Sequence, residues 1–553
     1  MNREAEAVTL TIDGRPLAAH AGESILEAAL RHGVTLPHLC HQPGLRPAGN
    51  CRACVVEIAG ERSLAASCCR SVQPGQVVRT DSERVQRAQR MVLELLAADQ
   101  PAKPHTLRSE LADWCEAMGV QRSRFESHAP PPADRSHPAI AVNLDACIQC
   151  MRCVRACREA QVNDVIAIAG WGADTRIGFD FDDPMGESSC VACGECVQAC
   201  PTGALTPANG AALAHADREV DSVCPYCGVG CQLTYRIKGE KIIEVVGRDG
   251  PANHGRLCVK GRYGFDYVHH AQRITTPLIR REGAPKTLDG FDPGAPLALF
   301  REATWDEALA RAGGGLRAIR ERDGAQALAG FGSAKGSNEE AYLFQKLVRT
   351  GFGSNNVDHC TRLCHASSVT ALLEGIGSGA VSNPVADVAE ADVIMIVGAN
   401  PTVNHPVAAT FIKNAVKAGK TLIVIDPRRT EITRHAQQVL QFRPGSDVAL
   451  FNAMLHTIIE EGLHDPAFIA ARTTHFEELR ANVARSSPEA MAPLCGIAAE
   501  DIRRAARTYA SAGNAMILWG MGVTQHVHGT DNARCLIALA LVTGHIGRPG
   551  NGL

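Results

Sequence analysis

The sequence predicts a chain of α+β and α/β domains, in which small cysteine-rich domains come first and doubly wound α/β domains follow. Three observations support this fold class. The chain has 553 residues, enough for roughly three to five domains with a substantial buried core. Sixteen of its 22 cysteines fall into short-spaced sets before residue 259. After residue 273, apolar runs rich in β-branched residues alternate with helix-like segments.

The composition argues against several classes of partner. Lys and Arg total 56 and Asp and Glu total 59, which gives a net charge of −3. We therefore expect that the chain binds neither a nucleic acid nor a charged membrane surface. No run of about 18 apolar residues is present, which predicts no membrane span. The first residues, MNREAEAVTLTIDG, contain neither an apolar signal core nor a twin-arginine pair, which favours the cytoplasm. In that reducing compartment, 22 cysteines are typical of metal ligands rather than disulfides.

Residues 1–80 are expected to form a β-grasp domain. Apolar and polar residues alternate from Val8 to Ile12, a turn signal follows at once, and AGESILEAALRHG has the pattern of a helix. Four cysteines lie at spacings that suit a 2Fe–2S cluster: Cys40, Cys51, Cys54 and Cys68. The segment resembles the plant-type 2Fe–2S domain of NADH-quinone oxidoreductase large subunits and NAD-dependent formate dehydrogenases. A zinc site is the alternative, and Cys69 is expected to be a spare thiol, with a ligand swap left open.

Residues 81–139 are expected to form a helical linker, beginning with the helix-like stretch SERVQRAQRMVLELLAADQ. Related proteins often carry a His-x3-Cys-x2-Cys-x5-Cys site for a 4Fe–4S cluster here. This chain has only His105 and Cys115 at that place. Two residues cannot hold a cubane, so we predict that the site is absent and that both residues have structural roles.

Residues 140–215 contain two near-repeats of the Cys-x2-Cys-x2-Cys-x3-Cys pattern of two-cluster ferredoxins. In this pattern the fourth cysteine of each run binds the other cluster, which ties the two halves together. One 4Fe–4S cluster is therefore predicted on Cys147, Cys150, Cys153 and Cys200. The other is predicted on Cys190, Cys193, Cys196 and Cys157.

Residues 216–272 supply a further set with the spacing Cys-x2-Cys-x3-Cys and a distant fourth cysteine: Cys224, Cys227, Cys231 and Cys258. It resembles the 4Fe–4S site that opens the dimethyl-sulfoxide-reductase superfamily of molybdopterin enzymes. The resemblance implies that Lys260, two residues after the last ligand, lies between this cluster and the pterin. A surface lysine is the alternative.

Residues 273–553 are predicted to be molybdopterin-binding α/β domains. Four short apolar runs are expected as buried parallel strands: 325–330, 392–398, 421–426 and 515–520. Ligands of such folds bind beyond the carboxyl ends of the strands. The loops there are rich in glycine, arginine, asparagine and aspartate, and together they resemble the loops that clasp two molybdopterin guanine dinucleotides. The residues assigned to that role, besides Lys260, are Gly398, Asn400, Asn404, Asp426, Arg428, Arg429, Gly445, Asp447, Gly522 and Gln525.

The stretch NNVDHCTRLCHASSV places Cys364 beside His365. It resembles the formate dehydrogenase form of the superfamily, in which a cysteine or selenocysteine binds the molybdenum or tungsten ion. The resemblance implies that Cys364 is the metal ligand and that His365 handles a proton; a soft thiolate suits such a metal. Covalent haem attachment, a zinc site with His359 and Cys360, and a plain buried cysteine are the alternatives. Isolated cysteines, namely Cys360, Cys495 and Cys535, are expected to pack in the interior.

The resemblance covers essentially the whole chain and implies the catalytic α subunit of an NAD-dependent formate dehydrogenase. Its cofactors would be a molybdenum or tungsten bis(molybdopterin guanine dinucleotide), one 2Fe–2S cluster and three 4Fe–4S clusters. It would oxidise formate to CO2 reversibly. No nucleotide-binding fingerprint for NAD or FMN is apparent, so NAD reduction is expected in a partner flavin- and NAD-binding iron–sulfur subunit. The alternatives are an electron-transfer subunit of an NADH dehydrogenase and a nitrate reductase of the same superfamily.

The sequence stops at GHIGRPGNGL, whereas members of this superfamily continue for several hundred residues. The resemblance implies that a substrate-binding arginine and the domain that completes one dinucleotide site belong to that continuation. We therefore expect a truncated chain that is inactive by itself.

Overall fold

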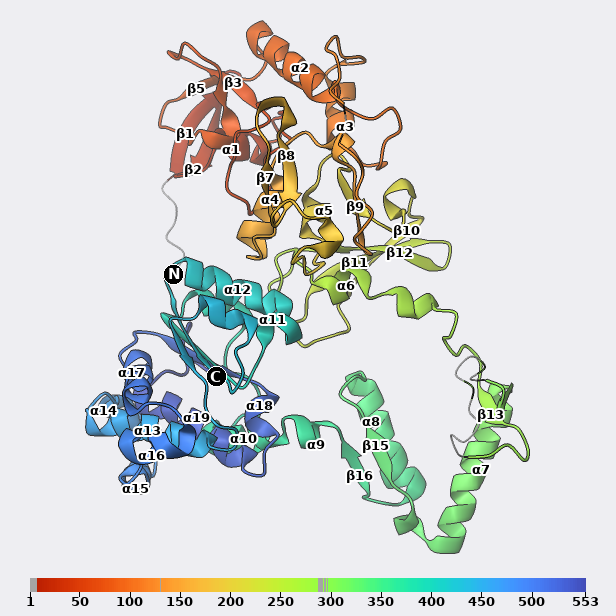
Figure 1. Cartoon of the computed structure of the whole chain (residues 1–553), viewed down its shortest axis with the longest axis vertical. Helices are drawn as coiled ribbons and strands as arrows, with labels where there is room; N and C mark the ends of the chain where they lie inside the picture. The colour runs from red at the N-terminus through yellow and green to blue at the C-terminus, as the bar shows by residue number, and fades with distance from the viewer. Residues whose placement is uncertain (1–6, 130, 287–291, 293–294, 296) are drawn as a thin grey trace. The chain divides into compact units, whose positions relative to one another are not determined.

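The computed structural model describes residues 7–129, 131–286, 292, 295 and 297–553. The chain divides into two compact units (Figure 1). The first comprises Met1–Asp266 with Pro401–Ala418, and the second comprises Tyr267–Asn400 with Gly419–Leu553. In the part of the chain that the structure describes, none of the helices combines the length and apolarity that crossing a bilayer requires.

A five-stranded β-grasp sheet opens the first unit, as predicted. Its strands lie in the order β2-β1-β5-β3-β4. Their bounds are Ala7–Ile12 for β1, Arg15–His20 for β2, Val55–Ile58 for β3, Ala65–Ala66 for β4 and Val77–Arg79 for β5. Helix α1 (Ile25–Arg31) begins with a capping box in which Ser24 and Glu27 bond each other's backbone amides. Its apolar face is buried against the sheet core.

Helices α2 (Glu83–Ala97) and α3 (Glu110–Ala117) pack on each other after this sheet. A ferredoxin-like segment follows, built from two short antiparallel strand pairs and two short helices. The strands are β6 (Ile140–Val142) with β9 (Leu205–Pro207), and β7 (Ile166–Ala169) with β8 (Arg176–Phe179). The helices are α4 (Arg152–Arg155) and α5 (Glu195–Ala199), each within one cysteine run.

The first unit ends in a three-stranded antiparallel sheet, formed by β10 (Arg218–Val223), β11 (Gln232–Lys238) and β12 (Lys241–Gly247), and helix α6 (Val259–Tyr263). Two helices from later in the chain, α11 (Pro401–Asn404) and α12 (Pro406–Lys417), also belong to this unit. The buried Lys413 on α12 donates hydrogen bonds to the carbonyls of Gln161 at 2.6 Å and Val162 at 3.1 Å. Those bonds satisfy the ammonium and fix α12 to the ferredoxin-like segment.

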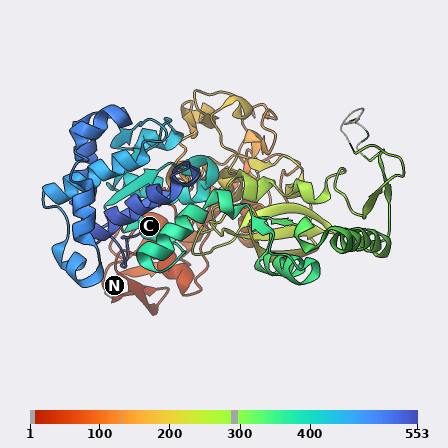
Figure 2. The same ribbon diagram turned by 90° about the horizontal axis from the view of Figure 1, so that it is seen from below.

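The second unit contains a four-stranded parallel sheet in the order β19-β18-β17-β20. Its strands are β17 (Val393–Val397), β18 (Thr421–Ile425), β19 (Gln438–Leu440) and β20 (Ala515–Trp519). Three of them confirm the predicted runs. The helices of the last third of the chain gather beside these strands (Figures 1 and 2). Those that build the core are α10 (Ala366–Ile376), α13 (Asp447–Glu460), α16 (Pro488–Cys495), α17 (Ala499–Ala510) and α19 (Gly529–Thr543).

The predicted strand at 325–330 is wrong. Helix α7 (Trp305–Asp323) ends at Gly324, which adopts a φ of +84°. Residues Ala325–Ala327, which follow it, form a 3-10 turn instead of a strand. The strand begins only at Gly330: β15 (Gly330–Gly332) pairs in parallel with β16 (Val357–His359) in a separate two-stranded sheet. The apolar character of the run reflected a turn beside α7 rather than a fourth buried strand.

The remaining elements of the second unit are short. Strands β13 (Leu278–Arg280) and β14 (Phe300–Glu302) form an antiparallel pair. The other helices are α8 (Asn338–Lys346), α9 (Thr361–Cys364), α14 (Pro466–Arg472), α15 (Phe476–Val483) and α18 (Met521–Thr524).

Candidate functional site

The four cysteines assigned to the 2Fe–2S cluster converge inside the β-grasp domain, each at most 5% exposed. Hydrogen bonds from the thiols of Cys51 and Cys68 hold the pKa of Cys40 well below its usual range. A hydrogen bond from Cys68 lowers the pKa of Cys54 to about 6. The same contacts raise the pKa of Cys51 and Cys68 above the ordinary value. Four sulfur atoms within mutual reach are the donor set that a small iron–sulfur cluster requires.

The spare thiol of Cys69 lies on the outer side of this set. Its Sγ atom is 3.6 Å from the Sγ atom of Cys68, and the residue is exposed. Gly49, at a φ of +66°, permits this placement, since a Cβ atom there would lie 2.9 Å from the Cys69 sulfur. The ligand swap between the two cysteines stays a prediction.

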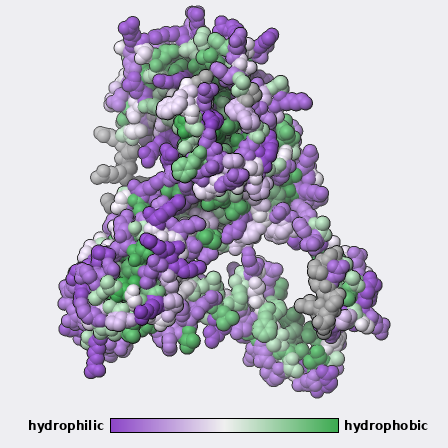
Figure 3. All heavy atoms as spheres, viewed as in Figure 1, coloured by the Kyte–Doolittle hydropathy of each residue, from purple (hydrophilic) through white to green (hydrophobic). Residues whose placement is uncertain are grey.

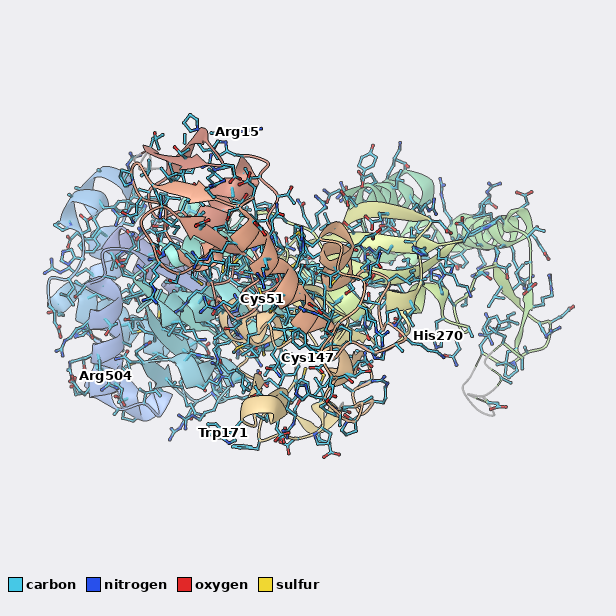
Figure 4. All side chains as sticks on the ribbon, turned by 90° about the horizontal axis from the view of Figure 1, so that it is seen from above. Arg15, Cys51, Cys147, Trp171, His270 and Arg504 are labelled. Atoms are coloured by element: carbon cyan, nitrogen blue, oxygen red, sulfur yellow. The ribbon has the colours of Figure 1, made fainter. Side chains whose placement is uncertain are left out.

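The structure brings together the cysteines that the ferredoxin pattern assigns to the first cubane. Cys147, Cys150 and Cys153 line one cavity with Cys200, the last cysteine of the other run. Burial raises the pKa of Cys147 to about 11 and that of Cys150 to about 12. Figure 4 labels Cys51 and Cys147, which lie inward of the exposed Trp171.

The reciprocal set also meets. Cys190, Cys193 and Cys196 all lie close enough to Cys157 for its charge to act on them. Burial is the main reason why the pKa of Cys193 rises to about 12. The structure thus brings together the cysteines of both sets that the ferredoxin pattern pairs, and their binding of clusters stays a prediction.

The third cubane set lines a comparable cavity. Cys224, Cys227, Cys231 and Cys258 surround it, and Val407 from α12 closes one side. Burial, followed by repulsion from the neighbouring thiolates, raises the pKa of Cys231 to about 12.

Lys260, on α6, extends beside this third set. Its Nζ atom donates to the carbonyl of Val403 at 3.4 Å, and its positive charge acts on the thiol of Cys224. The structure thus has a cation beside the cluster site, and the predicted place of Lys260 between cluster and pterin stays a prediction.

The donor sets fit iron–sulfur clusters on chemical grounds. In each cubane set burial raises the pKa of at least one thiol, so four thiolates can share such a cavity only with metal cations between them. Among the described residues, no three histidine, cysteine or acidic side chains lie close enough to share a single metal ion. The cysteines of the first and third cubane sets instead line small cavities.

His105 and Cys115 line one open cavity but belong to different contacts. His105 Nε2 lies 2.9 Å from both carboxylate oxygens of Asp145, two residues before Cys147. Burial raises the pKa of Cys115. The structural roles predicted for His105 and Cys115, and the absence of a cluster here, stay predictions.

In the second unit, the sheet order creates a switch point between β17 and β20. Strands β18 and β19 extend from one side of β17, whereas β20 pairs on its other side. At the carboxyl ends, the Gly522 amide donates to the Gly398 carbonyl at 3.0 Å. A Cβ atom at Gly398, whose φ is +54°, would lie 2.8 Å from the Gly522 carbonyl carbon, so the two loops touch through bare backbone. Ligands of open α/β sheets bind at such a point.

Cys364 lies at this switch point. Its Sγ atom is 3.3 Å from Met521 Sδ, and its carbonyl accepts a hydrogen bond from Thr524 Oγ1 at 2.7 Å. Helix α18, which follows β20, thus fixes the backbone of the predicted metal ligand. Burial, with a smaller effect from Cys360, raises the pKa of the Cys364 thiol. Cys360 itself is exposed, so the prediction that it packs in the interior is wrong, whereas Cys495 is buried and Cys535 partly buried.

His365 stands beside Cys364 and is half-buried. Its Nδ1 atom is 3.4 Å from Ser368 Oγ, which also accepts a hydrogen bond from Trp519 Nε1 at 2.8 Å. Burial lowers the pKa of His365, which keeps the imidazole neutral near pH 7. The neutral ring can accept a proton. Met521, Thr524, Ser368 and Trp519 were not among the predicted site residues.

Asp447 is the most informative of the predicted dinucleotide contacts. It is the first residue of α13, only 1% exposed, and neither carboxylate oxygen has a hydrogen-bond partner within the described ranges. Burial raises its pKa, and the charge of His526 and the nearby backbone amides of Asp447 and Gly445, which do not reach hydrogen-bonding geometry, offset part of this effect. An isolated buried carboxylate is costly unless something pairs with it. A ligand with two N–H donors would satisfy it.

The other predicted contacts in the second unit lie at the strand ends of the same sheet. Asp426 is buried and accepts from the Arg428 amide at 2.8 Å, while the Arg428 side chain is largely exposed. Asn404 differs, because α11 belongs to the first unit. The remaining residues that the sequence analysis assigned lie in strand-end loops of the second unit: Asn400, Arg429, Gly445 and Gln525.

Four domain families match the chain. The molybdopterin oxidoreductase family matches residues 273–553, and its Fe4S4 domain matches residues 217–270. A 2Fe–2S cluster-binding domain matches residues 5–83, and a 4Fe–4S dicluster domain matches residues 146–204. The chain thus combines iron–sulfur cluster-binding domain families with the molybdopterin oxidoreductase family in one mixed α/β fold.

The chain belongs to the molybdopterin oxidoreductase family. It is 34% identical to YjgC of Bacillus subtilis, named as a probable oxidoreductase, over 98% of this chain and 58% of that protein. It is 31% identical to a Staphylococcus aureus protein provisionally named as a formate dehydrogenase, over 99% of this chain and 59% of that protein. The chain therefore spans about three fifths of the length of these relatives.

Among solved structures, the acetylene hydratase of Pelobacter acetylenicus has a similar fold. The match has a TM-score of 0.54 and 24% identity, and it covers 60% of this chain and 44% of that one.

Proposed function

We propose that this chain forms part of an enzyme that oxidises formate to CO2 at a molybdenum or tungsten bis(molybdopterin guanine dinucleotide), with Cys364 as the protein ligand. The observation that carries the proposal is the placement of Cys364-His365 at the switch point between β17 and β20, against the bare-backbone contact of Gly398 and Gly522. The relatives named as formate dehydrogenases support the choice of substrate.

The bound metal would supply the two-electron redox chemistry of formate oxidation. The chain's own residues would prepare that chemistry. Thr524 holds the Cys364 backbone, so that the thiolate stays directed at one position. Neutral His365 would accept a proton, with Ser368 and Trp519 fixing its ring. Met521, in contact with the Cys364 sulfur, would help to exclude water.

Asp447 would bind one guanine of the dinucleotide cofactor. Guanine presents adjacent N–H donors, and a carboxylate accepts them as a pair, which would satisfy the two unpartnered oxygens. Glycines at Gly398, Gly445 and Gly522 would let the backbone approach the pyrophosphates, and Arg428 and Arg429 would pair with their charge. Asn400, Asp426 and Gln525 would complete the polar contacts in the second unit, and Asn404, in the first unit, stays a predicted contact by resemblance alone.

Electrons would leave through the cluster bound by Cys224, Cys227, Cys231 and Cys258, with Lys260 at its edge. Two further 4Fe–4S clusters and the 2Fe–2S cluster would pass them to a partner flavin subunit that reduces NAD⁺. Cysteines used as ligands rather than as disulfides suit the cytoplasm as the site of this complex.

The test is metal analysis and turnover of the purified holoenzyme that contains this chain. Molybdenum or tungsten in the preparation, with formate-dependent and nitrate-independent dye turnover, is the expected result. A complex that contains iron and neither of these metals would instead be an electron-transfer assembly. Dye oxidation driven by nitrate, without formate activity, would assign a nitrate reductase.

A further inference from the structure

A buried ion pair joins two of the cluster sites. Glu195 lies between Cys193 and Cys196, in the set that Cys157 completes, and Arg262 follows Cys258 of the third cubane set by four residues. Their side chains are only 10% and 4% exposed. Buried ion pairs cost desolvation energy and add little stability by themselves, so this pair calls for another explanation.

The contacts of the pair run from one ligand loop to the other. Arg262 donates from Nη2 to Glu195 Oε1 and from Nε to the carbonyl of Cys193 at 2.7 Å. In the opposite direction, Glu195 Oε1 accepts from the amide of Leu257, the residue before Cys258, at 3.0 Å. Each side chain therefore bonds the backbone of the other cluster's ligand segment.

Gly194 makes the close approach feasible. It has a φ of +72°, and a Cβ atom there would lie 2.2 Å from Arg262 Cδ and 2.6 Å from Tyr263 Oη. The guanidinium therefore packs directly on the cysteine loop, where a side chain at position 194 would displace it. Arg262 also donates from Nη1 to Gln198 Oε1 at 2.8 Å, so each of its three nitrogens has an acceptor.

We propose that Glu195 and Arg262 are positioning residues for electron transfer, which hold these two cluster sites together and set the reduction potential of the cluster bound by Cys157, Cys190, Cys193 and Cys196. This inference rests on the proposed cluster assignment. It concerns residues that touch no substrate.

The physical basis is electrostatic. The guanidinium keeps its charge at every accessible pH, and a charge in a poorly hydrated interior acts strongly on its neighbours. A reduced cluster carries one more electron than an oxidised one, so nearby positive charge stabilises the reduced form and negative charge opposes it. Net charge, hydrogen bonding and solvent exposure are the determinants of iron–sulfur potentials. With both partners present the pair is nearly neutral, which sets an intermediate potential.

The experiment is a redox titration of the holoenzyme followed by electron paramagnetic resonance, in which Cys193→Ser identifies the signal of this cluster. Glu195→Gln keeps the shape and the hydrogen bond from Leu257 but leaves the Arg262 charge unbalanced. We expect a shift to a more positive potential. Adding Arg262→Met removes that charge, and the double variant should shift back towards the wild-type value.

A purely structural role for the pair would produce no such reversal. The inference is overturned if Glu195→Gln leaves the potential unchanged or lowers it, or if the double variant stays as positive as the single one. Arg236→Met is the matched control, because its partners Glu219 and Glu244 form a more exposed network in the same unit, and it should leave this potential unchanged. If Cys193→Ser removes no signal from the wild-type spectrum, the cluster assignment itself fails, and the inference fails with it.

Discussion

The cysteine loops of the first unit and the strand-end loops of the second unit form their candidate sites in different ways. In the first unit, three ligands of each 4Fe–4S set lie within eight residues of sequence, and the fourth comes from a distant segment. In the second unit, Gly398, Asp447 and Met521 follow three different strands, and Cys364 comes from a helix before the sheet. The first kind of site can be recognised from the local spacing of its residues in the sequence, whereas the second depends on the order of parallel strands.

This difference predicts how each kind of site fails when a residue changes. A cysteine set loses its metal when one ligand is removed, because the other three cannot complete the cluster. A strand-end site keeps its fold and loses function, because its residues are not needed to build the sheet. The predictions below test that contrast.

The largest effect is expected at Cys364. Cys364→Ala should reduce formate-dependent dye turnover of the holoenzyme by at least about a thousandfold, since a metal ligand and its charge are removed together. The iron content and the cluster resonances should not change. The nearby Cys360→Ala is the control, and it should retain activity. Loss of activity in Cys360→Ala with full activity in Cys364→Ala would reverse the assignment.

The next effect is the loss of one cluster. Cys153→Ser should remove the 4Fe–4S cluster that Cys153 is predicted to bind with Cys147, Cys150 and Cys200. The iron content per protein should fall by about four atoms. Cys115→Ser should leave the iron content unchanged, because no cluster is predicted beside His105. A loss of iron in Cys115→Ser would show that this region holds a metal after all.

The contrast between the two units also explains what sequence could predict. The β-grasp sheet and the cysteine crossover depend on spacings within a few dozen residues, and the structure has both. The contact of Cys364 with Met521 joins positions 157 apart. No local pattern encodes that contact, because it exists only after β20 has paired with β17.

The wrong strand at 325–330 has a related cause. Its apolar residues resemble those of the true strands, but they follow the end of α7, where Gly324 turns the chain. The three confirmed strands are flanked by partners in one sheet, and the sequence of a run alone does not reveal its partners. Whether an apolar run forms a buried strand therefore depends on where it lies relative to the other elements of the fold.

Burial differs within the second unit in the same way, and this yields a stability prediction. None of the α7 side chains is buried, and apolar surface is visible around α8 and β15 (Figure 3). On α13, by contrast, Leu450 is fully buried in the core. Leu450→Ala should lower the free energy of unfolding by about 2–5 kcal/mol, whereas Leu309→Ala, 62% exposed on α7, should cost about 0.5 kcal/mol or less. Denaturant titration measures both, and equal losses would contradict the difference in packing.

The smallest effect, and the most diagnostic, is expected at Asp447. In the protein freed of its dinucleotide cofactor, the buried carboxylate has no partner within the described residues, so Asp447→Asn should raise the free energy of unfolding by about 1–3 kcal/mol at neutral pH. In the holoenzyme the same change should weaken cofactor retention, because the Asn side chain replaces one of the two acceptor oxygens with an NH2 donor and so cannot pair with two adjacent N–H groups. Opposite signs in the two forms are the expected signature, measured by thermal unfolding and by cofactor release.

The pH dependence follows from the direction of the pKa shift. Burial raises the pKa of Asp447 above the ordinary value of 3.8, so between these two values the folded chain holds a proton that the unfolded chain has lost. Stability therefore falls as the pH rises through this window and stays low above it. The cofactor-free wild type should gain stability relative to Asp447→Asn as the pH falls from 7 towards 4, by about 1.4 kcal/mol for each unit of pKa shift. A constant difference across that range would show that a polar group already satisfies the carboxylate, and would remove the guanine assignment from Asp447.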